Sequence, residues 1–237
     1  MIAILGASED DILYFRAKIK IEREETILGS KKVYIGHIFR EEAVIVAAGN
    51  SNYLSAMVAS IVLEKYDPYL VFSIGSCYSI KKELRQGDIF IADRTYLEHV
   101  DYSSIYPSNY GQIPGLPSFY LSDPELSDKA ERESYLVTQR YIQRGYLLSG
   151  DSFYGELEPI NHLLQEHYRT DDGIRAYDNS NAGIAIACHI RQVPLVSIRA
   201  VAYEVGNGDQ RLNWIRKGLE ASPTIGKIIT RILIDSI

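Results

Sequence analysis

Hydrophobic positions in this chain fall into two kinds of pattern. Runs made mostly of apolar residues, typical of strands buried on both faces, occupy residues 2–5, 70–74 and 195–201. Apolar residues at helical spacing follow short polar segments that end at Asp11, Asn52 and Asn181, where residue types suited to a helix N-terminus gather. This alternation of strand and helix predicts an α/β fold with a largely parallel sheet.

The remaining segments fit the same fold. Two apolar runs at 33–39 and 43–48, separated by charged residues 40–42, predict a hairpin. Glycine-containing loops are expected after the strands that end near residues 48 and 74, and residues 96–120 have no clear period, which is typical of a functional or interface loop. No internal repeat or linker is visible, so we expect one domain over residues 1–237. Further predicted elements are a strand at 87–93, a helix at 122–143, a strand and turn at 146–153, a helix at 159–168, a loop at 206–209 and a closing helix at 212–237.

Charge and cysteine content narrow the class of protein. The formal net charge is −6 and no Lys/Arg block exceeds two residues, which argues against a nucleic-acid surface. Cys77 and Cys188 lie far apart without metal-ligand spacing, as expected in a reducing compartment. No apolar stretch reaches the ~18 residues that a membrane span needs. We therefore expect a cytoplasmic protein without a membrane partner, and the five histidines show no spacing that predicts a metal site.

Carboxylates recur at the predicted carboxyl ends of strands, where ligands bind in open α/β sheets. Such groups suit general acid–base work or the recognition of hydroxyl groups. Helix caps and turns also explain each of them singly, as in the Ser8–Asp11 pair, which matches a capping box. No Walker, GxGxxG, HExxH or GxSxG motif accompanies them. The candidate cluster is Asp11, Asp151, Asp178 and Glu204, with Arg199 and Ser76.

Several short motifs, taken in order along the whole chain, resemble one known family. Residues 110–115 are Tyr-Gly-Gln-Ile-Pro-Gly and residues 149–153 are Ser-Gly-Asp-Ser-Phe, preceded by Gly-Ala at 6–7 and Gly-Ser at 75–76. With Arg199-Ala200, these motifs resemble the nucleoside phosphorylase superfamily, and within it the 5′-methylthioadenosine/S-adenosylhomocysteine nucleosidases. The resemblance implies a single three-layer αβα domain around a mixed, partly barrel-like sheet. It also implies a homodimer in which the Tyr110–Gly115 loop closes the partner's pocket.

The resemblance assigns roles to individual residues. Asp11 stands where the family has a glutamate that helps to activate water, and Phe153 stands where the purine stacks. Glu204 is the nearest carboxylate to the family position that protonates the purine. The resemblance implies a small-molecule nucleoside as ligand and no cofactor. The expected substrate-binding set is Ala7, Ser76, Cys77, Phe153, Tyr154, Tyr177, Asp178, Asn179, Ser180 and Arg199.

Several positions depart from the family pattern. Ser180 replaces a glutamate that grips the ribose hydroxyls, and Tyr78 replaces a glycine of the pocket wall. A gapless alignment places Tyr203 at the acid position, whereas a shift of one residue places Glu204 there. Two hypotheses follow: hydrolysis of the N-glycosidic bond of a purine nucleoside, or a catalytically weak or inactive nucleoside-binding protein. A Glu204 carboxylate beside Phe153 favours the first, and Tyr203 in that place favours the second.

Overall fold

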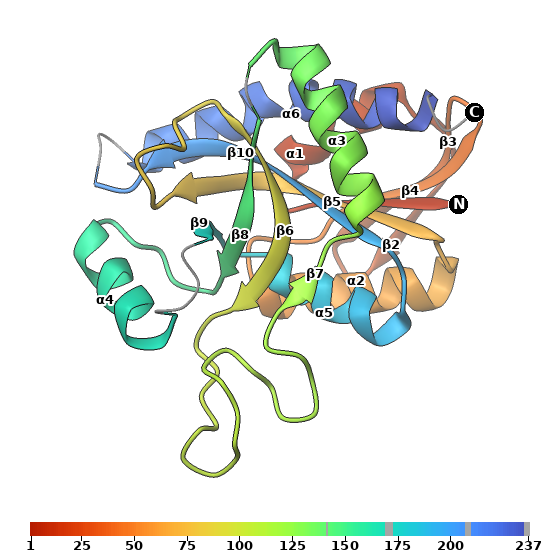
Figure 1. Ribbon diagram of the computed structural model, residues 1–237. Coiled ribbons are helices and arrows are strands. Elements are labelled where there is room, and N and C mark those ends of the chain that lie inside the picture. The colour runs from red at the N-terminus through yellow and green to blue at the C-terminus, as the bar shows by residue number, and fades with distance from the viewer. Residues whose placement is uncertain (141, 169–172, 207–209, 235–237) are drawn as a thin grey trace.

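The computed structural model describes residues 1–140, 142–168, 173–206 and 210–234, with no side chains described for 210–219. These residues form six helices and ten strands, mixed along the chain as expected of an α/β fold (Figure 1). The strands are β1 (Ile2–Gly6), β2 (Lys20–Ile27), β3 (Lys31–Ile38), β4 (Glu41–Ala47), β5 (Leu70–Ser79), β6 (Ile89–Leu97), β7 (Tyr120–Leu121), β8 (Gln143–Ser149), β9 (Ile174–Asp178) and β10 (Leu195–Glu204). The helices are α1 (Glu9–Lys18), α2 (Asn52–Tyr66), α3 (Pro124–Thr138), α4 (Leu157–His167), α5 (Asn181–Arg191) and α6 (Gln210–Ile234).

All ten strands belong to one mixed sheet that closes on itself at one end. The main path runs β10-β6-β8-β9-β5-β1-β4-β3-β2, and β7 pairs with β6. β5 also pairs with β10 over most of its length, so β5, β9, β8, β6 and β10 form a closed ring. This closure confirms the expected mixed, partly barrel-like sheet. It brings the carboxyl ends of β5 and β9 together, because Tyr78 lies opposite Tyr177.

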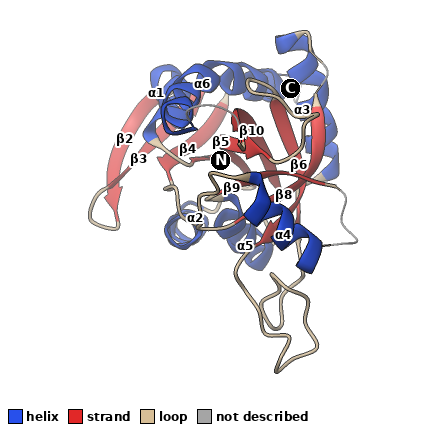
Figure 2. Ribbon diagram, turned by 90° about the vertical axis from the view of Figure 1, so that its left-hand side faces the viewer, coloured by secondary structure: helices blue, strands red, loops and turns tan. Residues whose placement is uncertain are grey.

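Helices cover the sheet on two sides. α1, α3 and α6 lie on one side over a cluster of buried side chains that includes Ile4, Phe15 and Phe72. α2 and α5 lie together on the other side, over a second cluster around Val46 and Val62 (Figure 2). The result is the expected three-layer αβα arrangement. Burial of these apolar faces is the main force that holds the layers together.

One local prediction is wrong, and one strand was not predicted. The predicted loop after residue 74 does not exist, because Gly75 and Ser76 lie inside β5, paired with Arg199 and Ala200 of β10. β2 was not predicted, because its sequence is mostly charged and lacks an apolar run. It lies at the edge of the sheet and pairs only with β3, so most of its side chains stay exposed.

The other predicted elements are present with shifted ends. β3 and β4 form the predicted hairpin, and residues 98–119 between β6 and β7 contain no helix or strand, as expected. This segment projects away from the layers, below β6 and β7 in Figure 1. Of the predicted loop at 206–209, residues 207–209 lie outside the described residues, as do the last three residues of the predicted closing helix. Among the described residues, no helix combines the length and the apolar character needed to cross a membrane.

Candidate functional site

The candidate site lies where several strands end. β1 ends at Gly6, β8 at Ser149 and β9 at Asp178, and the segments after these strands carry most of the predicted residues. β9 meets the last residues of β5, so both strands contribute their carboxyl ends to the same place. In α/β sheets, this edge is where ligands bind.

Asp11 is buried in the first turn of α1. Its Oδ2 accepts hydrogen bonds from the Ser8 backbone N (2.8 Å) and the Ser8 Oγ (2.7 Å), and its own backbone N lies 3.3 Å from that Oγ. The predicted capping box is therefore confirmed. Burial raises the pKa of Asp11 from 3.8 to about 6, although the bonds from Ser8 and the charge of Arg199 oppose the increase. A carboxyl with this pKa can accept a proton at neutral pH.

The surroundings of Asp11 are tightly fitted. A Cβ added at Gly75 would lie 3.1 Å from the Cβ of Ala7 and 3.7 Å from Oδ2 of Asp11. The predicted residues Ala7 and Asp11 therefore face the middle of β5, next to Ser76. Because Gly75 has no side chain and Ala7 has a small one, the Asp11 carboxylate lies close to the backbone of β5.

Arg199 and Asp178 form a fully buried ion pair. The Arg199 Nε donates to Asp178 Oδ2 at 2.8 Å, and the exposed fractions of the two side chains are 0% and 1%. Nη1 of Arg199 donates to the carbonyls of Ser73 (2.8 Å) and Ile198 (3.1 Å), and Nη2 donates to Ser73 Oγ (2.9 Å) and Asn181 Oδ1 (2.8 Å). All the donor groups of the guanidinium therefore face protein acceptors.

The other Asp178 oxygen is also bound within the protein. Oδ1 accepts from Ser149 Oγ at 2.5 Å and from the backbone N of Asn181 at 3.3 Å and of Ser180 at 3.4 Å. Asn181 extends this network, because its Oδ1 also accepts from Ser73 Oγ and Ser197 Oγ. Sequence analysis did not single out Asn181 as a site residue. The ion pair and Asn181 thus tie β5, β9, β10 and the start of α5 together.

Four aromatic rings form a wall beside this network. Tyr78 stacks between Tyr177 (ring centroids 4.9 Å apart) and Tyr203 (5.1 Å). Phe153 lies tilted against Tyr78 (6.0 Å) and Tyr203 (5.8 Å), and 55% of its surface is exposed. The predicted residues Tyr177 and Phe153 therefore belong to one cluster, which we call the aromatic wall (Tyr78, Phe153, Tyr177 and Tyr203).

Tyr203 contacts Phe153, with ring centroids 5.8 Å apart. The pairing of β10 with β5 shifts between Val201 and Tyr203, so Tyr203 faces Tyr78 and Glu204 faces Ser79. The Glu204 Oε1 accepts a hydrogen bond from the backbone N of Gln86 at 3.3 Å, on the connection between β5 and β6. Burial raises the pKa of Tyr203 above its ordinary value, so its hydroxyl stays protonated at neutral pH.

The other predicted residues fall into three places. Asn179 Nδ2 donates to the carbonyls of Gly150 (2.9 Å) and Ser152 (2.7 Å), and so holds the turn that carries Phe153. Ser180 precedes α5 at its N-cap position without a side-chain capping bond, and its Oγ lies 3.5 Å from Asp178 Oδ2. Cys77 packs in a separate cluster inside the sheet ring, with Leu84 and Phe90, rather than in the aromatic wall.

Asp151 acts as a helix cap. Its Oδ1 accepts from the backbone N of Asn52 at 2.9 Å, at the first residue of α2. The N-cap residue of α2, Ser51, makes no capping bond of its own. Of the strand-end carboxylates singled out in the sequence, Asp151 therefore has a structural explanation.

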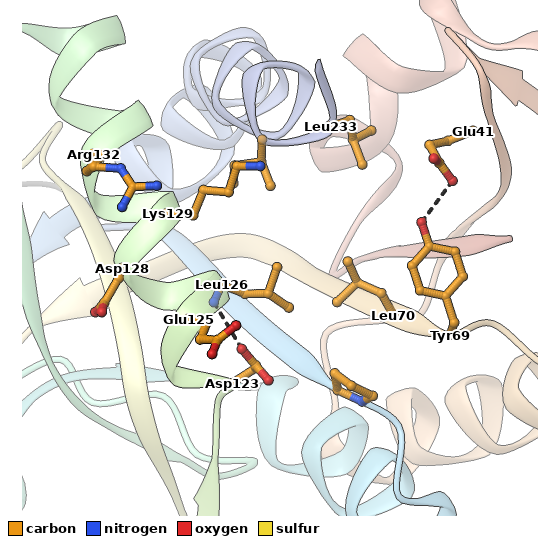
Figure 3. Close-up of a pocket in the computed structure, with 12 residues that line it drawn as sticks. Glu41, Tyr69, Leu70, Asp123, Glu125, Leu126, Asp128, Lys129, Arg132 and Leu233 are labelled. Atoms are coloured by element: carbon orange, nitrogen blue, oxygen red, sulfur yellow. Dashed lines mark hydrogen bonds between the residues drawn. The ribbon is translucent and has the colours of Figure 1, made fainter. Parts of the chain in front are cut away.

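A separate cavity lies at the opposite ends of the strands. It has a volume of about 590 Å³, and Figure 3 shows its lining. Leu70 begins β5, Glu41 begins β4 and Pro194 precedes β10, so the cavity is at the amino ends of these strands. None of the predicted site residues lines it. Volume alone does not mark a site, and the chemistry gathers at the other edge of the sheet.

Comparison with known proteins identifies the family of the chain. The family model described as the phosphorylase superfamily matches residues 1–233. The chain belongs to the phosphorylase superfamily. Among curated relatives, a 5′-methylthioadenosine/S-adenosylhomocysteine nucleosidase of Anoxybacillus flavithermus is 30% identical over 201 residues, which cover 85% of this chain and 84% of the relative. One of Staphylococcus epidermidis is 26% identical over 235 residues and covers 97% and 99% of the two chains.

Solved structures of this superfamily have the same fold. The S-adenosylhomocysteine nucleosidase of Streptococcus pyogenes, solved in complex with 5-methylthiotubericidin, has a TM-score of 0.87 and 25% identity, and covers 98% of this chain and 95% of its own. The resemblance noted in the sequence is thus confirmed for the fold and the family. No group of three or more potential metal ligands occurs among the described residues of this superfamily member.

One buried carboxylate near the aromatic wall, Glu98, was not predicted. Glu98 follows β6, and its Oε1 and Oε2 accept hydrogen bonds from the hydroxyls of Tyr154 and Tyr177. Its side chain is fully buried, and His99 Nε2 lies 3.2 Å from Oε1. Glu98 lies within residues 96–120, which have no clear period, and beyond the predicted strand at 87–93, so no pattern in the sequence pointed to it. In the structure it directly follows β6 (Ile89–Leu97).

Proposed function

We propose that this protein hydrolyses the N-glycosidic bond of a purine nucleoside of the 5′-methylthioadenosine/S-adenosylhomocysteine type or a variant of it. The observation that carries the proposal is the nearly full-length match to relatives named as nucleosidases for these two substrates. The retained carboxylate of Asp11 supports it, since burial raises the pKa of this group to about 6. The whole described chain shares one sheet, which supports a single domain.

In the proposed reaction, Asp11 accepts a proton from the attacking water. The water oxygen bonds to the anomeric carbon of the sugar while the bond from that carbon to the purine nitrogen breaks. Phe153, half exposed at the edge of the aromatic wall, stacks on the base. Two serines offer hydroxyls to the sugar. The Oγ of Ser180 lies 3.5 Å from Asp178 Oδ2, and Ser76 pairs with Ala200, the residue after Arg199. Arg199 and Asp178 are buried away from solvent, and they hold the segments that carry these serines in place.

The surroundings of Tyr203 and Glu204 support a second candidate function, because they determine which group can protonate the leaving purine. Tyr203 lies against Phe153, whereas the carboxylate of Glu204 binds the Gln86 amide. A general acid typically contributes ~10²–10⁴-fold to the rate, so a protein without one hydrolyses slowly. The second candidate is therefore a nucleoside-binding protein with little or no hydrolysis.

Release of free base from a panel of nucleosides separates the two candidates. The panel contains 5′-methylthioadenosine, S-adenosylhomocysteine, adenosine and inosine, and the variants are Asp11→Asn and Glu204→Gln. We expect base release that falls ~10²–10⁴-fold in Asp11→Asn. A loss in Glu204→Gln would mean that Glu204 turns into the pocket when substrate binds. Binding of a nucleoside without release of any base would establish the second candidate and overturn the first.

We also propose that two copies of the chain associate. α2 and α5 pack side by side and present exposed apolar side chains: Tyr53 (78% exposed), Met57 (53%) and Ile190 (61%). The projecting segment carries three more, Tyr102, Ile105 and Tyr106. Exposed apolar side chains on two packed helices support an interface with another protein chain. In such a homodimer, the Tyr110–Gly115 part of the projecting segment closes the pocket of the partner.

The free, buried cysteines Cys77 and Cys188 support a location in the cytoplasm, because unpaired thiols persist in a reducing compartment.

A further inference from the structure

Glu98 is a buried carboxylate that the proposed reaction does not use. Burying a charged group is costly unless hydrogen bonds compensate for the lost water, so a fully buried carboxylate needs dedicated partners. Glu98 has them: the phenol groups of Tyr154 and Tyr177 donate to separate oxygens, and His99 Nε2 lies 3.2 Å from one of these oxygens. We call this group the Glu98 node (Glu98, His99, Tyr154 and Tyr177).

The Glu98 node is hydrogen-bonded to the turn that carries Phe153. Tyr154 follows Phe153 directly, and the residue before it, Ser152, is held by two members of the node. The Ser152 backbone N donates to the hydroxyl of Tyr177 at 3.3 Å, and Ser152 Oγ lies 2.8 Å from His99 Nε2. Both chain neighbours of Phe153 are therefore fixed through Glu98.

Gly150 shows how closely the carboxylate approaches this turn. A Cβ added at Gly150 would overlap Glu98 Oε2 and the hydroxyl of Tyr177. The backbone of Glu98 is tied to the same strand end, because its N donates to the carbonyl of Ser149 at 2.9 Å. The absence of a side chain at Gly150 therefore leaves room for the Glu98 carboxylate, and the turn packs directly against the Glu98 node.

The ring of Phe153 lies at the exposed edge of the aromatic wall. More than half of its surface is exposed, and its ring contacts within the aromatic wall, to Tyr78 and Tyr203, are tilted. Because the ring is attached to the turn of residues 150–154, a fixed backbone in this turn helps to set the position of the ring.

We infer that Glu98 is a positioning residue, which fixes the turn of residues 150–154 and so holds the Phe153 ring in place to stack on the base of the substrate. This role rests on the proposed function. It needs no contact between Glu98 and the substrate, because the carboxylate acts through Tyr154, Tyr177 and Ser152.

The test compares Glu98→Leu and Glu98→Gln with Tyr168→Phe. A glutamine keeps one acceptor oxygen and gains donors that can bind the second phenol, so it should restore the node, whereas leucine cannot bind either phenol. Tyr168→Phe is the matched control, because it removes a neighbouring buried phenol that donates to the Leu97 carbonyl and not to Glu98.

The first measurement is amide hydrogen exchange of residues 150–154, which requires no activity. We expect exchange at least ~10-fold faster in Glu98→Leu and close to wild type in the other two variants. The second is hydrolysis of 5′-methylthioadenosine: KM should rise ~10-fold in Glu98→Leu, as expected for a weakened base–aromatic stack, with kcat changed less than ~3-fold. Wild-type exchange and KM in Glu98→Leu would overturn the inference, as would a fall in kcat at unchanged KM.

Failure of the proposed function gives a different result. If the wild-type protein releases no base, the dissociation constant of adenine measured by calorimetry replaces KM, with the same expected ~10-fold rise. Wild-type protein that neither hydrolyses nor binds adenine would overturn both proposals. If Glu98→Leu does not fold, the double variant Tyr154→Phe/Tyr177→Phe removes both donors and should behave as Glu98→Leu is expected to behave; wild-type values in it would overturn the inference.

Discussion

Replacing Arg199 by methionine should destabilise the protein strongly, because it leaves a charged group buried without its partner. Arg199 makes five hydrogen bonds, to Asp178, Ser73, Ile198 and Asn181. Methionine fills much of the same space but binds none of these acceptors. Breaking a buried ion pair by removing one partner costs about 3–5 kcal/mol. We therefore expect the free energy of unfolding to fall by about 4 kcal/mol.

Urea denaturation of the purified protein at pH 7 and fixed protein concentration measures this loss. The matched control is Arg191→Met, which removes an exposed ion pair with Glu64 whose N–O distance is also short, 2.6 Å. An exposed pair contributes about 0–1 kcal/mol, so the control should stay near wild type. The double variant Arg199→Met/Asp178→Leu should recover part of the loss, because no charge is then left buried. A fall below about 1 kcal/mol in Arg199→Met, equal to the control, would refute the assignment of Arg199 as the centre of the buried network.

Three further results are expected. Because burial raises the pKa of Asp11 from 3.8 to about 6, the folded state binds this proton more tightly than the unfolded state, so the free energy of unfolding should fall by about 3 kcal/mol as the pH rises from about 4 to 6. Urea titrations across this range should show the fall in wild type and not in Asp11→Asn; equal slopes would contradict the raised pKa. Gly183→Ala should lower the free energy of unfolding by about 1–3 kcal/mol, since the new Cβ overlaps the Asn52 carbonyl and Ser55 Oγ; an unchanged urea midpoint would show that α2 and α5 can move apart without cost. Met57→Asp should weaken the proposed dimer ~30-fold, since burying an unpaired carboxylate costs about 2 kcal/mol. Sedimentation velocity at a series of protein concentrations measures the monomer–dimer equilibrium. An equilibrium unchanged from wild type would show that α2 lies outside the interface.

The features that local sequence determines were predictable. The Ser8–Asp11 capping box involves groups three residues apart, so the sequence alone specifies it. The two strands of the β3–β4 hairpin are equally local. β2 escaped prediction because an edge strand needs no apolar run, and its pairing with β3 is determined by the rest of the sheet.

The features that depend on register between distant strands were not predictable. Whether Tyr203 or Glu204 lies beside Phe153 is decided by a shift in the β5–β10 pairing between Val201 and Tyr203. A gapless alignment and a one-residue gap are equally consistent with the sequence there. Moving one residue along a strand exchanges the faces of the sheet, so a single irregularity determines which chemical group reaches the site.

The same limit applies to the partners of predicted residues. Arg199 and Asp178 both stood out in the sequence, but nothing local shows that they bind each other and Asn181 rather than a ligand. Glu98 could not be recognised, since its partners Tyr154 and Tyr177 lie 56 and 79 residues away along the chain.

Arg199 and Asp178 make their hydrogen bonds within the protein, and this affects how the sequence can change during evolution. Because every donor of the guanidinium is used inside the protein, the fold does not depend on a bound molecule to neutralise its interior. Substitutions at Tyr78 or Tyr203 can then alter the shape offered to a ligand while the charges beneath remain compensated. Selection on the aromatic wall can therefore change ligand preference, and selection on the Arg199–Asp178 network can change folding. Ligand preference and folding are then two nearly independent traits.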